Sequence, residues 1–430
     1  MQLDIINISD FLLSELRRLI HNMVQKNQAL RPSAIELVNN ANVFSQDTRT
    51  LTAVIPLSQL ANQKILEVLN SNPMDNLDVL KSLNESLLTY ITPRLNFAAY
   101  YLLKGLEAAN TYFMDTESKY REMFITNRNN QILKDPYLFL ENVFQYDTPY
   151  VFRPPKLSAN NIVFFAPSTE EGASQLCPKS QFLRQWNHIT HGIFTNVDTT
   201  NLFFAGGAVL AALQPFDEDQ DLDTQLEQSG YYNSDIDVFM YGITSPEQAT
   251  LRAEQFCEEI VMLCNGDVLL LRTVHTLTII RPYPKRQIQL IFRLYCSPAE
   301  VLMGFDIDSC CVGYDGTNVY GLPRFSRSII TGYNLVDISR RSPSYEYRLY
   351  KYSKRGFGVL VEGVNRNDID FDYSHINATK GIHRLIAFER GMAVQLNERK
   401  NGKTGRCFKY ENGTMVEVSI EDSEMAGTCL

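Results

Sequence analysis

The chain has 430 residues, of which 44% are hydrophobic and 21% are charged, and its formal net charge at pH 7 is −9. This composition is typical of a folded protein, and the length predicts two or three domains. The negative charge argues against a broad, nonspecific nucleic-acid surface, although it leaves room for a local basic groove.

Neither membrane insertion nor secretion is expected from the sequence. No apolar run approaches the roughly 20 residues that span a bilayer, and the start of the chain lacks the basic and apolar regions of a signal peptide. The eight cysteines include no C-x-x-C pair, and several lie in apolar runs, as in Phe256-Cys257 and Leu263-Cys264. Free thiols are therefore favoured over disulfides or a zinc site, and we expect a cytoplasmic protein with no membrane partner.

Residues 1–145 are interpreted as a helical domain. Ser9-Asp10 can cap a helix over 11–20, and further amphipathic stretches lie near 57–70, 77–91, 94–113 and 117–133. No cluster of polar residues recurs on one face of these helices. A bundle that packs against the rest of the chain, or assembles with a partner protein, is therefore favoured over a domain with its own pocket.

Residues 146–199 are interpreted as a linker or an irregular segment, because proline, serine and asparagine are frequent in the first part. Near its end, His188 and His191 are three residues apart and could share one face of a helix. That spacing is compatible with a metal. Ordinary packing or capping is favoured, because no third or fourth ligand lies nearby in the sequence.

The stretch from 202 to 242 contains the candidate catalytic and metal-binding residues of the chain. An apolar run, Leu202 to Ala205, ends in Gly206-Gly207, which predicts a strand, a tight turn and the start of a helix. Further on, Asp235 and Asp237 alternate with large apolar residues, so on a strand both carboxylates share one face. Such a pair suits Mg²⁺, which takes hard oxygen ligands and completes its shell with water and phosphate oxygens, while a glycine turn lets backbone N–H groups approach a phosphate.

This combination of Gly206-Gly207 with Ser234-Asp235-Ile236-Asp237 resembles the motif of the polymerase-beta-like nucleotidyltransferase superfamily, over roughly residues 200–325. The resemblance implies that Gly206, Gly207 and Ser234 bind a nucleoside triphosphate. It also implies that Asp235 and Asp237 are catalytic and bind Mg²⁺ or Mn²⁺. Three further segments are similar to uncharacterised nucleotidyltransferase-like regions of large fungal, protist and viral proteins, and they cover residues 297–300, 304–311 and 340–346.

The remaining pattern supports an α+β fold. After 200 we expect a helix over 245–264, strands over 268–275, 276–281, 286–295 and 306–314, and a hairpin turn at Asp315-Gly316. Residues 326–430 are basic and aromatic, with a helix over 345–352 and a terminal hairpin. The predicted order is a helical domain, the segment 146–199, a polymerase-beta-like nucleotidyltransferase mixed-sheet domain over 200–325, and a small C-terminal extension.

Members of the resembled superfamily use a third carboxylate on a strand beside the acid-x-acid strand. In this chain the expected positions hold Gln287 and Gln289. Glutamine can orient a hydroxyl, but it neither neutralises a cation nor accepts a proton at ordinary pH. A site with two carboxylates is therefore expected to bind one Mg²⁺ and a nucleotide, and to transfer slowly or not at all.

Asp306 and Asp308 are the candidates for a missing third ligand. They repeat the alternating acidic pattern, and an extended segment would place both on one face. Against this role, they follow a predicted helix and can lie at the far end of the sheet.

Two charged stretches leave alternatives open. The acidic stretch 214–230 is favoured as a solvated surface loop over a metal or partner site. The basic segment 340–355 could contact a triphosphate or an RNA backbone, with its tyrosines stacking on bases, or it could be a packed helix with solvated charges. The two stretches could also pair with each other.

Two functions follow from these observations. The first is a Mg²⁺-dependent nucleotidyltransferase that moves NMP from an NTP to a hydroxyl of protein, nucleotide or RNA. The second is a nucleotidyltransferase fold that has lost its chemistry and acts as a structural or binding module in a larger assembly. The intact glycine pair and carboxylates favour the first, and the neutral residues at 287 and 289 favour the second.

Overall fold

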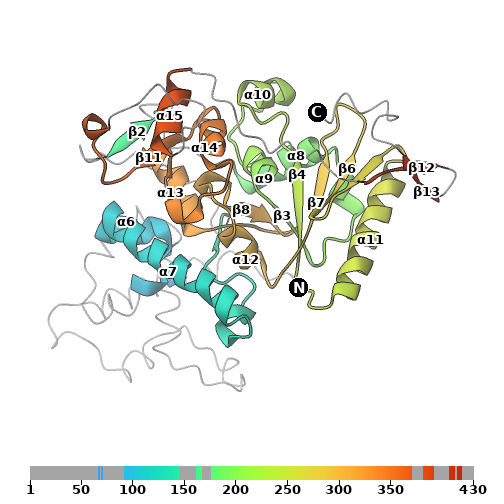
Figure 1. Cartoon of the computed structure of the whole chain (residues 1–430), viewed down its shortest axis with the longest axis horizontal. Coiled ribbons are helices and arrows are strands. Elements are labelled where there is room, and N and C mark those ends of the chain that lie inside the picture. Colours follow the sequence, from blue (N-terminus) through green and yellow to red (C-terminus); the bar gives the residue numbers. More distant parts are fainter. Residues whose placement is uncertain are drawn as a thin grey trace, which may run out of the picture. The chain divides into compact units, whose positions relative to one another are not determined.

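The structure is a computed structural model that describes residues 66–67, 69–70, 92–144, 161–166, 176–369, 381–391, 406–411 and 414–418 (Figure 1). The chain divides into two compact units, residues 1–109 and 110–430. The helices predicted over 11–20 and 77–91, and most of the one over 57–70, lie outside the described residues.

The end of the first unit is helical, as the sequence predicts. A short helical turn, η3 (Thr92–Arg94), precedes α6 (Phe97–Lys104), whose first turn is capped by the Asn96 side chain accepting from the Ala99 N–H at 2.9 Å. Gly105, with φ of 88°, ends α6. The helix α7 (Leu106–Thr126) then runs without interruption through residues 114–116, where the sequence predicts a gap between two helices.

A ten-stranded mixed sheet organises the second unit (Figure 1). Every neighbouring pair of strands is antiparallel except β4 and β7, which are parallel. In spatial order the strands are β1 (Glu141–Asn142), β9 (Val319–Gly321), β8 (Val312–Tyr314), β3 (Leu202–Ala205), β4 (Ile236–Tyr241), β7 (Ile288–Tyr295), β6 (Thr276–Ile280), β5 (Leu269–Arg272), β12 (Arg406–Glu411) and β13 (Thr414–Val418).

The apolar run at 202–205 forms the central strand β3, and all four of its residues are buried. It leads directly into α9 (Gly207–Ala212), and β4 follows after α10 (Leu222–Gln228). The helix α11 (Pro246–Leu263) begins at the Ser245 cap that the sequence predicts. It precedes β5, β6 and β7, and α12 (Pro298–Met303) follows β7.

The structure differs from the sequence interpretation in the segment 146–199. Residues 145–160 and 167–175 lie outside the described part, but the rest contains β2 (Ile162–Phe164), α8 (Lys179–Thr190) and η5 (Ile193–Asn196). The reason is amphipathicity, since Phe182, Trp186 and Ile189 share one helix face and are buried. The Trp186 ring lies 5.4 Å from that of Phe204 on β3, so α8 is part of the sheet-bearing core.

The basic C-terminal region is also more integrated than a small extension. It supplies most of α13 (Pro323–Thr331), which begins within the predicted domain 200–325. It also supplies η7 (Ile338–Arg340), α14 (Tyr345–Ser353), η8 (Arg366–Asp368) and α15 (Ile382–Glu389). Two of its strands, β10 (Tyr333–Leu335) and β11 (Gly358–Val361), form a three-stranded sheet with β2. The terminal hairpin is β12 and β13, and β12 pairs with β5, so the hairpin extends the large sheet.

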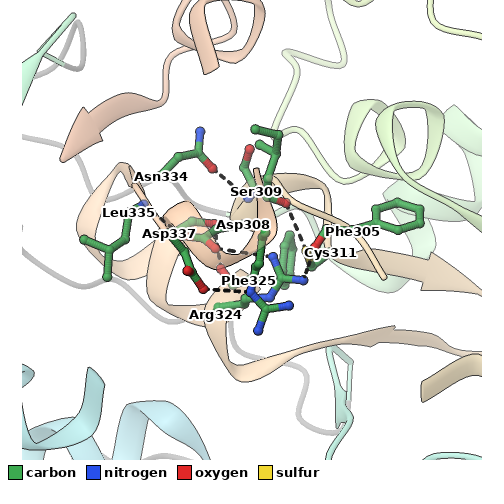
Figure 2. A network of polar contacts seen from close by, with 12 residues as sticks. Phe305, Asp308, Ser309, Cys311, Arg324, Phe325, Asn334, Leu335 and Asp337 are labelled. Carbon is green, nitrogen blue, oxygen red and sulfur yellow. Dashed lines mark hydrogen bonds and ion pairs between the residues drawn. The ribbon is translucent and has the colours of Figure 1, made fainter. Parts of the chain in front are cut away.

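The strand predicted over 306–314 is only partly a strand. Residues Asp308–Cys310 form the helical turn η6, and β8 begins at Val312. The departure has an electrostatic cause, because the Asp308 carboxylate is buried and needs donors. It accepts from the Arg327 guanidinium at 2.8 Å and from the Leu335 backbone N–H at 2.8 Å, and Figure 2 shows the latter contact.

These contacts belong to a buried ion network, which we define as Glu117, Asp308, Arg324, Arg327 and Arg340. Their side chains are at most 5% exposed. Arg324 donates to Glu117 at 3.1 Å and to Asp308 at 3.4 Å, and an Arg340 nitrogen lies 3.0 Å from Glu117. The network thus joins α7, η6, α13 and η7.

None of the helices in the described part of the chain is both long enough and apolar enough to cross a membrane.

We expect Asp308→Asn to lower the free energy of unfolding by about 3 kcal/mol, because it leaves the buried Arg327 guanidinium without its negative partner and Arg324 with Glu117 alone. Urea unfolding followed by circular dichroism measures the change. Asp219→Asn is the matched control, since Asp219 is exposed on the surface, and it should change stability by less than about 0.5 kcal/mol. Equal stabilities for the two variants would show that the network is not needed.

Candidate functional site

Strand pairing brings the predicted site residues of the central sheet together. On the antiparallel pair β3 and β4, Ala205 lies opposite Asp237, and Gly206 follows at the end of β3. On the parallel pair β4 and β7, Asp237 lies opposite Gln289. The glycine turn, the carboxylate and the amide therefore meet at one end of three adjacent strands.

The glycine turn is approached closely from two sides. Gly206 has φ of 89°, a conformation that favours glycine, and its N–H donates to the Val312 carbonyl oxygen at 2.9 Å. A Cβ atom at Gly206 would lie 3.3 Å from the Phe305 ring and 3.8 Å from Asp237 Oδ2. One at Gly207 would lie 3.2 Å from Arg355 Nη1. A side chain at either position would fill the space between the turn and these groups.

The two carboxylates differ in their surroundings. Asp235 is exposed just before β4, whereas Asp237 is half-buried within the strand. Burial, together with the negative charge of Asp235, raises the pKa of Asp237 to about 7, and Lys351 on α14 acts in the opposite direction. A cation between the carboxylates would remove this repulsion.

Gln289 is in direct contact with one carboxylate. Its Nε2 donates to Asp235 Oδ2 at 2.8 Å. The other candidate position, Gln287, contributes its backbone carbonyl oxygen to the Ile236 N–H at 3.0 Å. The structure therefore identifies Gln289 as the residue directly beside the acid pair.

Ser234 is held by two arginines. It is buried, its hydroxyl accepts from Arg355 Nη2 at 2.8 Å, and its carbonyl oxygen accepts from Arg286 Nη1 at 3.0 Å. Arg355 is only 7% exposed and lies between the rings of Tyr231 and Tyr352, with its guanidinium carbon 4.5 and 4.9 Å from their centroids. Its Nη1, the atom nearest Gly207, has no hydrogen-bond partner among the described residues.

Arg355 Nη1 is one of several buried guanidinium nitrogens without a hydrogen-bond partner among the described residues, and each unmade hydrogen bond has a cost. Arg355 Nη1 faces the glycine turn, so an anion placed there would satisfy it. The sequence marks Arg355 only as one member of the basic segment 340–355. It predicts Arg286 as the first residue of a strand, and no sequence signal marks either arginine as a neighbour of Ser234.

Asp306 and Asp308 are already engaged elsewhere. Asp306 is paired with Arg348 of α14 at 2.5 Å, and Asp308 belongs to the buried ion network. Because positive groups hold both carboxylates, we leave them out of the candidate cation site. Their predicted common extended face is interrupted, because Asp308 begins the η6 turn.

The two charged stretches contact each other where Arg355 Nε donates to the Gly230 carbonyl oxygen at 3.1 Å, but their ion pairs are with other partners. In the acidic stretch 214–230, Glu218 pairs with Arg184 and Asp223 with His188, both on α8. In the basic segment 340–355, Arg340, Arg341 and Arg348 form ion pairs with Glu117, Glu346 and Asp306, respectively. Most of the basic segment is therefore structural, and Lys351 and Arg355 are its members near the site.

The donor set fits a hard cation that also binds substrate oxygens. Among the described residues, no group of three or more histidine, cysteine or acidic side chains is placed to hold a metal. His188 and His191 therefore belong to no such group. Two carboxylates are nevertheless sufficient for Mg²⁺ or Mn²⁺ when water and phosphate complete the shell. A separate groove of about 940 Å³ lies between α11 and β5 to β7. Its lining residue Met240 is three positions after Asp237 on β4, and Phe292 is three positions after Gln289 on β7. Residues an odd number apart on a strand point to opposite faces, so the groove is on the opposite face of the sheet from the carboxylates.

Comparison with known proteins gives two similarities. Residues 178–331 match the profile of a family described as Gabija anti-defense 2, a range that includes the glycine turn, both carboxylates and Gln289 but ends before Arg355. An uncharacterised protein of Acanthamoeba polyphaga mimivirus is 33% identical over 180 residues, which cover 38% of this chain and 37% of that protein. The match thus spans little more than a third of the viral relative. No solved structure matches the chain.

The raised pKa of Asp237 predicts a dependence of stability on pH. Between pH 3.8 and about pH 7, the Asp237 carboxyl keeps its proton in the folded chain, whereas in the unfolded chain, with an ordinary pKa of 3.8, it has lost the proton. This contribution is present in full below pH 3.8 and is lost as the pH rises through about 7. Between about pH 5 and about pH 8, we expect the wild type to lose on the order of 2 kcal/mol more stability than Asp237→Asn.

Urea unfolding of both proteins at the two pH values, without divalent cations, measures this difference. Because the other titrating groups are common to both, only the difference in slope is assigned to Asp237. Parallel pH profiles would contradict the raised pKa.

Proposed function

We propose that the chain is a Mg²⁺-dependent nucleotidyltransferase that moves NMP from a nucleoside triphosphate to a hydroxyl of protein, nucleotide or RNA. The observation that carries the proposal is the meeting of the glycine turn with Asp237, whose Oδ2 lies 3.8 Å from the position of a Cβ at Gly206. The motif resemblance to polymerase-beta-like nucleotidyltransferases suggests the reaction, and the placement of the glycine turn beside Asp237 supports it.

In this proposal Gly206, Gly207 and Ser234 bind the triphosphate, and Arg355 contributes a further contact. A phosphate beside Gly207 would accept from Arg355 Nη1 and neutralise a buried positive charge. Asp235 and Asp237 bind the cation, for which Mn²⁺ can substitute. When bound, the cation neutralises the phosphate oxygens and orients the triphosphate.

In the transfer, the acceptor hydroxyl oxygen forms a bond to the α-phosphorus, and the bond from that phosphorus to the oxygen bridging to the β-phosphate breaks. Pyrophosphate leaves with the electron pair of the broken bond. The hydroxyl proton passes to solvent water, because Gln289 cannot accept it. This chain therefore contributes chiefly by positioning and charge.

One observation favours the second function, a binding module built on a nucleotidyltransferase fold. Gln289 occupies the place beside Asp237 where a third carboxylate would complete the site. Such a module would still bind a nucleotide through Arg355 and the glycine turn, but it would release the nucleotide unchanged.

The match to a family described as Gabija anti-defense 2 supports a biological role in counteracting the Gabija defence. Because the matched range contains the glycine turn, both carboxylates and Gln289, although it ends before Arg355, we propose that the site is needed for this role. Nucleotidyl transfer to a component of the defence, or binding of a nucleotide without transfer, corresponds to the first and the second function, respectively.

We expect Asp235→Asn and Asp237→Asn to abolish label transfer from radiolabelled NTPs in the presence of Mg²⁺ or Mn²⁺, since each removes a charge that holds the cation. Each of the four NTPs is tested with and without RNA or protein acceptors. Asp219→Asn, which changes an exposed carboxylate on the acidic stretch, should keep full activity.

Full transfer by Asp235→Asn would refute the assignment of the carboxylates. The same variants, produced in cells that carry the Gabija defence, report on the biological role. Counter-defence that survives both substitutions while transfer is lost would favour the binding module.

We expect Arg355→Met to weaken binding of inorganic tripolyphosphate by roughly 10- to 100-fold, because a hydrogen bond between charged groups contributes about 1.5–3 kcal/mol. Isothermal titration without divalent cations measures this affinity. Lys354→Met is the matched control, because Lys354 is exposed and its ammonium lies over the Tyr350 ring. Unchanged affinity in folded Arg355→Met would remove Arg355 from the site.

A further inference from the structure

The position of Gln289 is fixed by the strand register rather than by its own side chain. It lies opposite Asp237 on the parallel neighbour of β4 and opposite Thr278 on β6. Residues opposite each other on adjacent strands point to the same face of the sheet. The Gln289 side chain is therefore committed to the face that carries Asp237.

Gln289 is a neutral side chain that makes a hydrogen bond to Asp235. Its amide nitrogen donates to Asp235 Oδ2 at 2.8 Å, so the side chain supports one carboxylate as a hydrogen-bond donor. An amide carries no charge, so its oxygen, although it can bind a cation, does not offset the repulsion between two cations. The position that would bridge two cations holds an orienting group instead.

Neighbouring groups do not replace the missing charge. Asp306 and Asp308 are held by Arg348 and by the buried ion network. Lys351 interacts electrostatically with both Asp235 and Asp237. Its positive charge opposes the binding of additional cations by the acid pair.

We propose that the site binds a single divalent cation together with the phosphate chain, and that Gln289 is the residue that sets this number. The inference rests on the proposed function, because it assumes that Asp235 and Asp237 hold a cation. It goes further by assigning the stoichiometry to one side chain. Gln289 is a positioning residue here, since it acts on the cation through Asp235.

A carboxylate at 289 would reverse this arrangement. Gln289→Glu keeps the length of the side chain and replaces its donor nitrogen by an oxygen ligand. Three carboxylates on one sheet face could then share two cations about 3.5–4 Å apart, as in two-metal sites. The substitution is expected to create a second cation site rather than to strengthen the first.

The experiment counts Mn²⁺ bound per chain by equilibrium dialysis against Mn²⁺ with equimolar inorganic tripolyphosphate, and it needs no turnover. We expect one ion for the wild type, two for Gln289→Glu and none for Asp237→Asn. Gln289→Ala removes the hydrogen bond to Asp235 without adding a ligand, and it should still bind one ion. Gln248→Glu, an exposed change of the same charge on α11, should also bind one.

The outcomes separate this inference from the function on which it rests. Two ions in the wild type would overturn the inference and leave the cation site standing. One ion in Gln289→Glu would also overturn it, provided that circular dichroism shows a folded chain. If that variant is unfolded, the count for Gln289→Asp decides in the same way. No ion in the wild type would refute the cation site itself, and the inference with it.

Discussion

The hydrogen-bonded pairing of β3, β4 and β7 is the constraint on which the rest of the site depends. The antiparallel pairing of β3 with β4 sets Gly206 beside Asp237, and the parallel pairing of β4 with β7 sets Gln289 on the other side of Asp237. A slip of one residue in either pair would turn these side chains to the opposite face. The site therefore exists only in this register.

Two groups of buried arginines serve different purposes around that sheet. Arg324 and Arg327 are compensated by Glu117 and Asp308 within the fold, and this network holds the loop before β8. Arg324 also donates to the carbonyl oxygen of Phe305 at 2.7 Å, and the Phe305 ring packs beside the glycine turn. The stability of the network and the shape of the turn are thus coupled through one loop.

Arg355 belongs to the second group, whose hydrogen bonds go to neutral partners. Its described hydrogen bonds are with the Ser234 hydroxyl and the Gly230 carbonyl oxygen, while Nη1 faces the glycine turn without a partner. The positive charge of Arg355 is therefore not neutralised by its hydrogen-bond partners and can attract an anion. The neutral Gln289 offers no negative charge to a second cation. The proposed binding of phosphate together with a single cation is compatible with both proposed functions, a slow transferase and a nucleotide-binding module.

The sequence by itself determined the local elements that carry the chemistry. The glycine pair, the alternation around Asp235 and Asp237 and the neutral residue at 289 are patterns that adjacent residues impose. Tertiary structure alone decided that Asp308 is neutralised within the fold and that Arg355 lies against Gly207, 148 residues earlier (355 − 207). Such outcomes depend on burial and on charges brought together from distant segments, and local sequence patterns do not encode these partners.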